Sequence, residues 1–131
     1  MFTDVARVVR ASALPDEALD PSPLEQSQVV AGAPEVRLLE LHDSAALGVG
    51  LWQHSAGVST DVEADEVFVV LSGRATIEVE DGPTLEVGPG DVGLLPAGAR
   101  TTWTVHETLR KVYVARPPAA AEVNDSGGIR P

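Results

Sequence analysis

Short segments rich in β-branched, apolar and aromatic residues follow one another from residue 36 to residue 115, with glycine or proline turns between them. Segments of this length and composition are typical of β-strands. No sustained 3.6-residue period occurs in this region, so helices are not expected there. The pattern predicts an all-β sandwich or barrel. The predicted strands are residues 36–42, 47–54, 67–71, 75–80, 84–87, 92–95, 101–106 and 109–115.

The alternation of residue types is clearest in segment 75–80. Apolar and polar residues alternate there at every position, which places one strand face in a core and the other in solvent. Asp81-Gly82 follows as a hairpin signal. Gly73, just before the segment, is expected to take a positive φ where the chain reverses. We therefore predict two separate strands on either side of Gly73.

The two ends of the chain lack this pattern. Residues 1–29 contain several prolines and acidic residues, and we expect an irregular arm in which residues 5–10 could form a short strand. Residues 30–116 are the predicted barrel. Residues 117–131 combine a Pro-Pro pair, an alanine run and a Ser-Gly-Gly sequence, which predicts a disordered tail.

Length, charge and cysteine content narrow the possible binding partners and the cellular compartment of the protein. A chain of 131 residues is long enough for one domain with a core and too short for two. A net charge of -11 argues against binding to nucleic acid or to an anionic membrane, because both are negatively charged. The absence of cysteine excludes disulfides and thiolate ligands. Because we find neither a membrane-spanning apolar stretch nor a secretory signal pattern, we predict a cytoplasmic protein.

Two spacings, Glu66-x6-Gly73 and Gly90-x5-Pro96-x-Gly98, resemble the two conserved motifs of the cupin superfamily. Further blocks look like the small single-domain cupins related to (S)-ureidoglycine aminohydrolase; they include Gly50-Leu51-Trp52, Asp65-Glu66-Val67-Phe68, Thr102-Trp103 and Arg110-Lys111-Val112-Tyr113. The resemblance covers residues 30–116 and implies a jelly-roll β-barrel, commonly assembled as a homodimer. The arm formed by residues 1–29 could then pack on the dimer partner.

The histidines that hold a metal in many cupins are missing from this chain. The family places a His-x-His pair shortly before the motif glutamate; the shorter family spacing reaches Thr60 and Val62, and the longer one reaches Ser59 and Asp61. The third family histidine is replaced by Thr101. Since one glutamate alone holds a transition metal poorly, we predict neither a bound metal nor another cofactor.

An acidic stretch is the remaining candidate for a cation site. Asp61, Glu63 and Asp65 alternate along it and could bind a hard cation such as Mg²⁺. We interpret the stretch instead as the solvated face of a loop that leads into the barrel.

Glu66 and Lys111 are the candidate catalytic residues. In the resemblance Glu66 points into the barrel, where burial would raise its pKa and suit it to proton transfer. Lys111 is the only lysine, lies in the middle of a predicted strand and shares a strand face with Leu109 and Tyr113. A lysine buried there must pair or lose its charge, and Glu66 is its natural partner. The pair could be a structural brace or an acid–base couple.

Five further residues are candidates for ligand binding. Trp52 and Trp103 are the only tryptophans, and each could either pack in the core or offer a flat face and an N–H donor to a ligand. His54 shares a strand face with Trp52. Thr101 stands where the family has a metal ligand, and Tyr113 shares the face of the single lysine.

These residues favour a cupin that binds a small polar metabolite without a metal. One alternative is a metal-dependent enzyme of the ureidoglycine aminohydrolase type, a hydrolase or isomerase of a small nitrogen-containing or sugar-like substrate; the missing histidines count against it. Another alternative is a structural or regulatory dimer with an inert barrel. Because one barrel fold hosts many unrelated activities, the fold does not identify the ligand.

Overall fold

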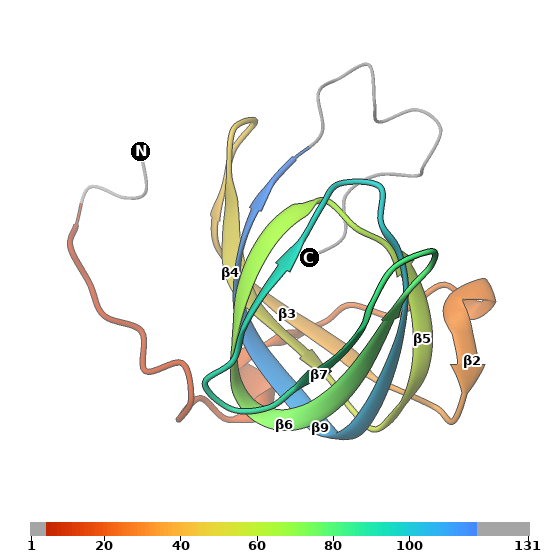
Figure 1. Ribbon diagram of the computed structural model, residues 1–131. Helices are drawn as coiled ribbons and strands as arrows, with labels where there is room; N and C mark the ends of the chain where they lie inside the picture. Colours follow the sequence, from red (N-terminus) through yellow and green to blue (C-terminus); the bar gives the residue numbers. More distant parts are fainter. Residues whose placement is uncertain (1–4, 118–131) are drawn as a thin grey trace.

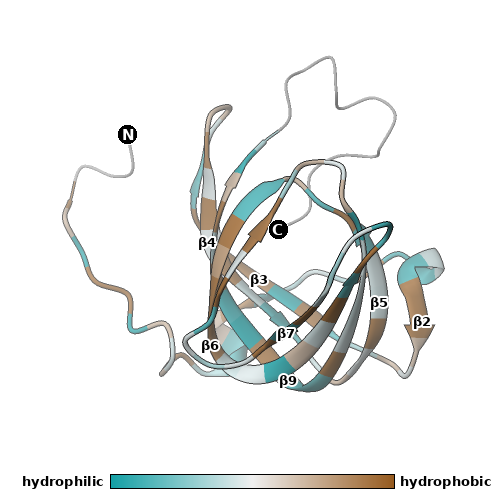
Figure 2. Cartoon of the chain, in the orientation of Figure 1, coloured by the Kyte–Doolittle hydropathy of each residue, from teal (hydrophilic) through white to brown (hydrophobic). Residues whose placement is uncertain are grey.

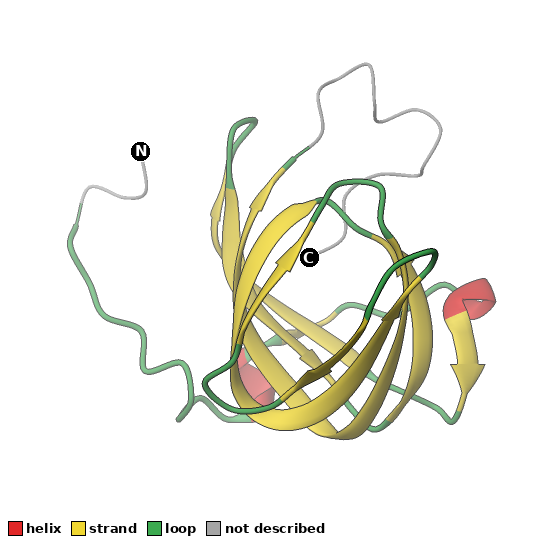
Figure 3. Cartoon of the chain, viewed as in Figure 1, coloured by secondary structure: helices red, strands yellow, loops and turns green. Residues whose placement is uncertain are grey.

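The computed structural model describes residues 5–117 and has the predicted all-β architecture (Figures 1 and 3). Two 3₁₀ turns, η1 (Asp16–Ala18) and η2 (Gln26–Gln28), accompany the strands. The strands are β1 (Asp20–Pro21), β2 (Val29–Ala31), β3 (Val36–Asp43), β4 (Gly48–His54), β5 (Gly57–Val62), β6 (Asp65–Val79), β7 (Thr84–Val87), β8 (Val92–Leu95) and β9 (Arg100–Arg116). Within the described residues, none of the helices could cross a membrane, being too short and insufficiently apolar.

Strand β9 organises the sheet. Residues 100–105 of β9 pair with β5, residues 109–115 pair with β4, and the opposite edge of β9 pairs with β6. β3 extends the sheet beyond β4, while β7 and β8 pair with different parts of β6. All these pairings are antiparallel, and the sheet curls on itself into a barrel (Figure 1). Both halves of β9 therefore line the same interior.

Two pairs of predicted strands are single long strands. Segments 67–71 and 75–80 both belong to β6, and segments 101–106 and 109–115 both belong to β9. Gly73 has the expected positive φ of 84°, but it lies in a bulge of β6 and not at a reversal. A Cβ atom at Gly73 would overlap the carbonyl group of Thr108 on β9, so only glycine fits. A glycine with positive φ occurs both in β-bulges and in turns. For this reason the sequence pattern predicts a turn at Gly73, and two strands where the structure has one.

The acidic stretch is not a solvated loop. Residues 57–62 form β5, which pairs with β2 and β9, and Glu63 directly after it is only 4% exposed. The interpretation of Glu63 as a solvated residue is therefore wrong. β5 contains few of the apolar residues that are typical of a strand, so its sequence does not indicate one. It is a strand because its backbone hydrogen-bonds to β2 on one side and β9 on the other.

The N-terminal arm contacts the barrel of its own chain. β1 and β2 pair with β3 and β5, and Leu19 is completely buried. Residues 5–10 do not form the strand predicted for them; they run beside the barrel (Figure 1). Packing of the arm on a second subunit, and the homodimer itself, stay predictions. The predicted disordered tail lies outside the described residues, except for Pro117.

Hydropathy alternates along the barrel strands, and Figure 2 shows the resulting apolar and polar bands. The inward side chains form one hydrophobic cluster. Trp52 from β4, Phe68 from β6 and Trp103 from β9 contribute its large aromatic rings. Strands from every part of the barrel therefore place side chains around one central point.

Candidate functional site

Lys111 and Glu66 form an ion pair inside the barrel. The ammonium nitrogen of Lys111 lies 2.6 Å from Oε2 of Glu66, and both side chains are completely buried. Adjacent strands position the two residues, since Lys111 lies on β9 opposite Val70 of β6, and Glu66 lies near the start of β6, opposite Ala115 of β9. The predicted partnership is present, and its role as a brace or an acid–base couple stays a prediction.

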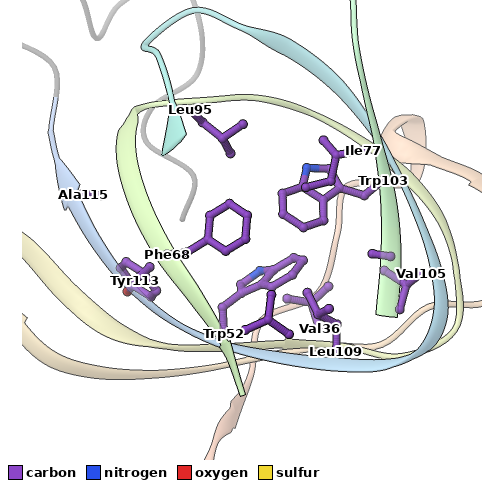
Figure 4. Close-up of a cluster of buried hydrophobic side chains, with 12 residues drawn as sticks. Val36, Trp52, Phe68, Ile77, Leu95, Trp103, Val105, Leu109, Tyr113 and Ala115 are labelled. Atoms are coloured by element: carbon purple, nitrogen blue, oxygen red, sulfur yellow. The ribbon is translucent and has the colours of Figure 1, made fainter. Parts of the chain in front are cut away.

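Three aromatic rings surround the ammonium group of Lys111. Its nitrogen lies 4.5 Å from the ring centroid of Trp52 and 4.7 Å from those of Phe68 and Trp103. Figure 4 shows these rings gathered in the middle of the barrel. Gly93 makes room for Phe68, because a Cβ atom there would overlap the phenyl ring. A cation within about 6 Å of a ring centroid is attracted by the ring, so the three rings stabilise the charge of a lysine removed from solvent.

Glu63 is a second buried carboxylate close to this pair. Its Oε2 accepts hydrogen bonds from Oγ1 of Thr101 at 2.6 Å and from Nε1 of Trp103 at 3.1 Å. Its other oxygen, Oε1, has no hydrogen-bond partner, and neither does Oε1 of Glu66; within residues 5–117 these are the buried side-chain atoms left unsatisfied. Unsatisfied buried acceptors are rare in folded proteins, so these two oxygens are exceptions within the barrel interior.

The buried carboxylates change the proton affinities of this interior. Burial raises the pKa of Glu66 above its ordinary value of 4.5; the ammonium group of Lys111 lowers it without cancelling the effect, and the charge of Glu63 raises it further. Burial also raises the pKa of Tyr113, and nearby carboxylates, including Glu66, add to that increase. Glu66 therefore exchanges its proton at a higher pH than an exposed glutamate does.

His54 is a neutral and fully hydrogen-bonded side chain. Its Nδ1 lies 2.6 Å from the carbonyl oxygen of Ser55, and its Nε2 lies 2.8 Å from Oγ of Ser59. Because a carbonyl only accepts, Nδ1 carries the proton and Nε2 accepts from the Ser59 hydroxyl. Burial lowers the pKa of His54 below 6.5, the Ser55 carbonyl partly offsets this effect, and the charge of Lys111 lowers the pKa further. Neither ring nitrogen is left for a metal ion.

The residues at the family's metal-ligand positions do not fit a metal ion. β5 pairs with β9 so that Ser59, and not Thr60, lies buried on the inner face, which means that the longer family spacing applies. The hydroxyl groups of Ser59 and Thr101 are bonded to His54 and Glu63, and neutral hydroxyls are poor ligands for transition metals. Among the residues that the structure describes, no three His, Asp or Glu side chains are grouped to hold a metal.

A pocket of about 300 Å³ opens beside Trp52 and Trp103. Barrel strands form its inner walls, and residues 22–25 of the arm, with Gln28, form its outer wall. Nε2 of Gln28 donates to the backbone carbonyl of Thr60 at 3.1 Å, which ties this wall to β5. A wider groove of about 730 Å³ adjoins the pocket, because Glu25, Gln28, Thr60 and Asp61 line both.

The structure brings five of the predicted site residues together. Trp52 and Trp103 line the pocket, and Lys111 with Glu66 lies behind their rings. His54 packs beside Trp52, with 5.3 Å between the ring centroids. The interior is therefore a layered arrangement in which the tryptophans separate the pocket from the buried ion pair.

Two predicted residues do not line the pocket, although Thr101 bonds Glu63 and Trp103 and Tyr113 belongs to the same hydrophobic cluster; two other residues were missed. Thr101 lines the adjoining groove, while Tyr113 lines a separate hollow of about 250 Å³. The sequence reasoning missed Ser59 as the partner of His54 and Glu63 as an inward carboxylate. The alternation of positions 59, 61 and 63 was the signal that could have found them, had the stretch been taken as a strand. The ligand-binding roles of all these residues stay predictions.

Comparisons with known proteins agree with this architecture. The family model described as the EutQ-like cupin domain matches residues 42–113. The EutQ protein of Clostridium difficile is 22% identical, with a TM-score of 0.59 over 76% of this chain and 82% of its own. A conserved protein of unknown function from Streptococcus pyogenes is 22% identical, with a TM-score of 0.58 over 92% of this chain and 95% of its own.

A third solved structure is longer than this chain. It is a protein of unknown function from Pseudomonas syringae pv. tomato, 29% identical, with a TM-score of 0.66 over 73% of this chain. The aligned part is 43% of that protein. No curated protein matches the chain in sequence.

Proposed function

The chain belongs to the family of EutQ-like cupin domains, and on this basis we propose that it binds a small polar molecule in the pocket beside Trp52 and Trp103. The observation that carries the proposal is the pocket itself. Its volume of about 300 Å³ is that of a small ligand site, and two large rings lie next to polar groups of Gln28, Ser59 and Asp61. Such walls bury the body of a ligand and orient its polar atoms.

The proposed binding requires no metal. In place of a metal ion, the interior holds the ammonium group of Lys111, with Glu66 as its counter-charge and aromatic rings around it. These contacts hold the side chain of Lys111 in one position behind the two tryptophans that line the pocket. A metal-dependent enzyme of the ureidoglycine aminohydrolase type would need a set of donors that these residues do not supply, so we do not propose that activity.

The test is a metabolite screen that reads the pocket directly. Both tryptophans of the chain line it, so a bound ligand should change the intrinsic fluorescence as well as raise the melting temperature. A ligand at a hundred times its Kd should add about 2.7 kcal/mol to the free energy of unfolding. We expect Leu24→Phe, which fills the arm side of the pocket, to lose both signals.

Leu94→Phe is the matched control, because Leu94 is 74% exposed on β8 and is absent from the pocket lining. A ligand that stabilises the wild type and Leu24→Phe equally would bind outside the pocket and contradict the proposal. A broad screen without any binder would favour the inert barrel instead.

A further inference from the structure

The hollow of about 250 Å³ beside Tyr113 is a second place where a small molecule fits. Its polar lining consists of Glu40, His42, Asp43 and Tyr113. Its remaining lining consists of Leu38, Gly48, Ala115 and Pro117. Of the described residues, only Leu38 also lines the pocket beside the tryptophans, so the two sites can be tested separately.

The hydroxyl group of Tyr113 lacks a hydrogen-bond partner. Tyr113 is 6% exposed, and within residues 5–117 its hydroxyl makes no hydrogen bond. The fully buried unsatisfied atoms of this part of the chain are Oε1 of Glu63 and Oε1 of Glu66, so the Tyr113 hydroxyl, unlike them, reaches accessible space. That space is the hollow. An accessible and unbonded hydroxyl on an otherwise buried side chain indicates a partner from outside the chain.

The strand register directs this hydroxyl toward β3. Gly50 of β4 lies opposite Tyr113 of β9 on one side and opposite Glu40 of β3 on the other. A Cβ atom at Gly50 would lie only 2.7 Å from the hydroxyl oxygen of Tyr113, so the phenol ring lies over this glycine. Because Gly50 has no side chain, the ring extends across β4 in the direction of Glu40. The phenol and the carboxylate therefore line one hollow from two different strands.

The charges that act on this phenol are negative. Burial raises the pKa of Tyr113 above its ordinary value of 10, and the carboxylates of Glu40, Glu66 and Asp43 raise it further. The hydroxyl therefore keeps its proton at neutral pH and can donate it in a hydrogen bond. No lysine or arginine occurs in the described lining of the hollow. A cation is attracted to such a site and an anion is repelled.

We propose that this hollow binds a small primary ammonium compound that also carries a hydrogen-bond acceptor, such as an amide carbonyl. The ammonium group pairs with the exposed carboxylates of Glu40 and Asp43, and the acceptor receives the hydrogen bond of the Tyr113 hydroxyl. The apolar walls cover the short carbon chain between the two polar groups. This second site does not depend on the proposed function of the tryptophan pocket.

The experiment compares four probes of similar size. β-Alaninamide has the ammonium group and the carbonyl, butyramide lacks the charge, malonamate is an anion, and isopentylamine lacks the carbonyl. The affinity is measured by NMR at neutral pH from the backbone amide signals of Gly48, which lines the hollow, and Gly50, beneath the phenol ring. We expect β-alaninamide to bind about tenfold more tightly than butyramide, because two carboxylates attract its charge, and malonamate not to bind.

Two variants separate the two halves of the site. Tyr113→Phe removes only the hydroxyl and should weaken β-alaninamide about fivefold, as expected for one neutral hydrogen bond, without affecting isopentylamine. Glu40→Gln removes an exposed charge and should weaken both amines about threefold. Glu107→Gln, which removes an exposed carboxylate outside the hollow, is the matched control and should bind both amines normally.

The contrary outcomes are distinct. Equal affinities for β-alaninamide and malonamate would overturn the cation class, and an unchanged affinity in Tyr113→Phe would overturn the role of the hydroxyl. Absence of any change at Gly48 with both amines would overturn the site itself. Loss of β-alaninamide binding in Leu24→Phe would place the probe in the tryptophan pocket, which overturns the second site and leaves the proposed function intact.

Discussion

Arg110 and Lys111 are consecutive residues of β9, and both are buried cations, yet they serve different parts of the molecule. Lys111 points into the barrel, where its ammonium group has a carboxylate partner and three aromatic rings. Arg110 points outward beneath the arm. Its Nε donates to Oε1 of Gln53 at 2.8 Å, and its Nη1 donates to the carbonyls of Ala11 and Leu14 at 2.9 and 2.7 Å.

The difference follows from the shapes of the two side chains. A guanidinium group has five donors in a rigid fork, which lets Arg110 bond neutral acceptors and the carboxylate of Asp16 on one folded segment. An ammonium group is compact and fits between aromatic rings with one counter-charge. One strand thus uses a lysine to stabilise the interior and an arginine to attach residues 11–16 of the arm to the outside of the barrel.

The largest effect should come from removing the interior cation. Lys111→Met leaves Glu66 buried without its counter-charge, and loss of one partner of a buried pair costs about 3–5 kcal/mol. Urea unfolding followed by tryptophan fluorescence measures this cost. Replacement of both partners, as in Lys111→Met with Glu66→Leu, should recover much of the loss, because Glu66 is then no longer a buried charge without its partner, while Glu63 keeps its bonds to Thr101 and Trp103.

An equal loss in the single and double variants would show that Lys111 acts through packing and not through its charge. Arg74→Met is the exposed control, since Arg74 forms a surface ion pair with Glu107 that should contribute about 0–1 kcal/mol.

A smaller and more local effect is expected for Arg110→Lys. The charge stays, but the fork that bonds Ala11, Leu14 and Gln53 is lost, at a cost of about 1–3 kcal/mol. The arm should loosen, so acrylamide should quench Trp52 and Trp103 more strongly than in the wild type. Unchanged quenching with lowered stability would show that Arg110 supports the strand and not the arm.

The smallest effect is the pH dependence that belongs to Glu66. Because its folded pKa is raised above 4.5, the protonated carboxyl favours the folded state, and this contribution is lost as the pH rises through the folded pKa. The stability of the wild type relative to Glu66→Gln should therefore decrease over that range. Urea titrations of both proteins at stepped pH measure the difference, and a relative stability that grows with pH would contradict the raised pKa.

The sequence by itself determined that the chain is all-β and which two residues form the central ion pair. Short alternating segments and glycine turns specify local structure, and a lone lysine in mid-strand needs a carboxylate partner. The inward direction of Glu66 came from the cupin spacing and not from its neighbours.

Only the tertiary structure decided the pocket. Glu63 became a buried carboxylate because β9 pairs with the polar segment before it, a long-range pairing that local composition does not encode. The arm became a pocket wall because Ser22 N–H donates to the carbonyl of Val36 and the Gln28 side chain donates to the carbonyl of Thr60, both in distant strands. Contacts to backbone carbonyls have no residue signature, so a wall held by them becomes visible only when the chain is folded.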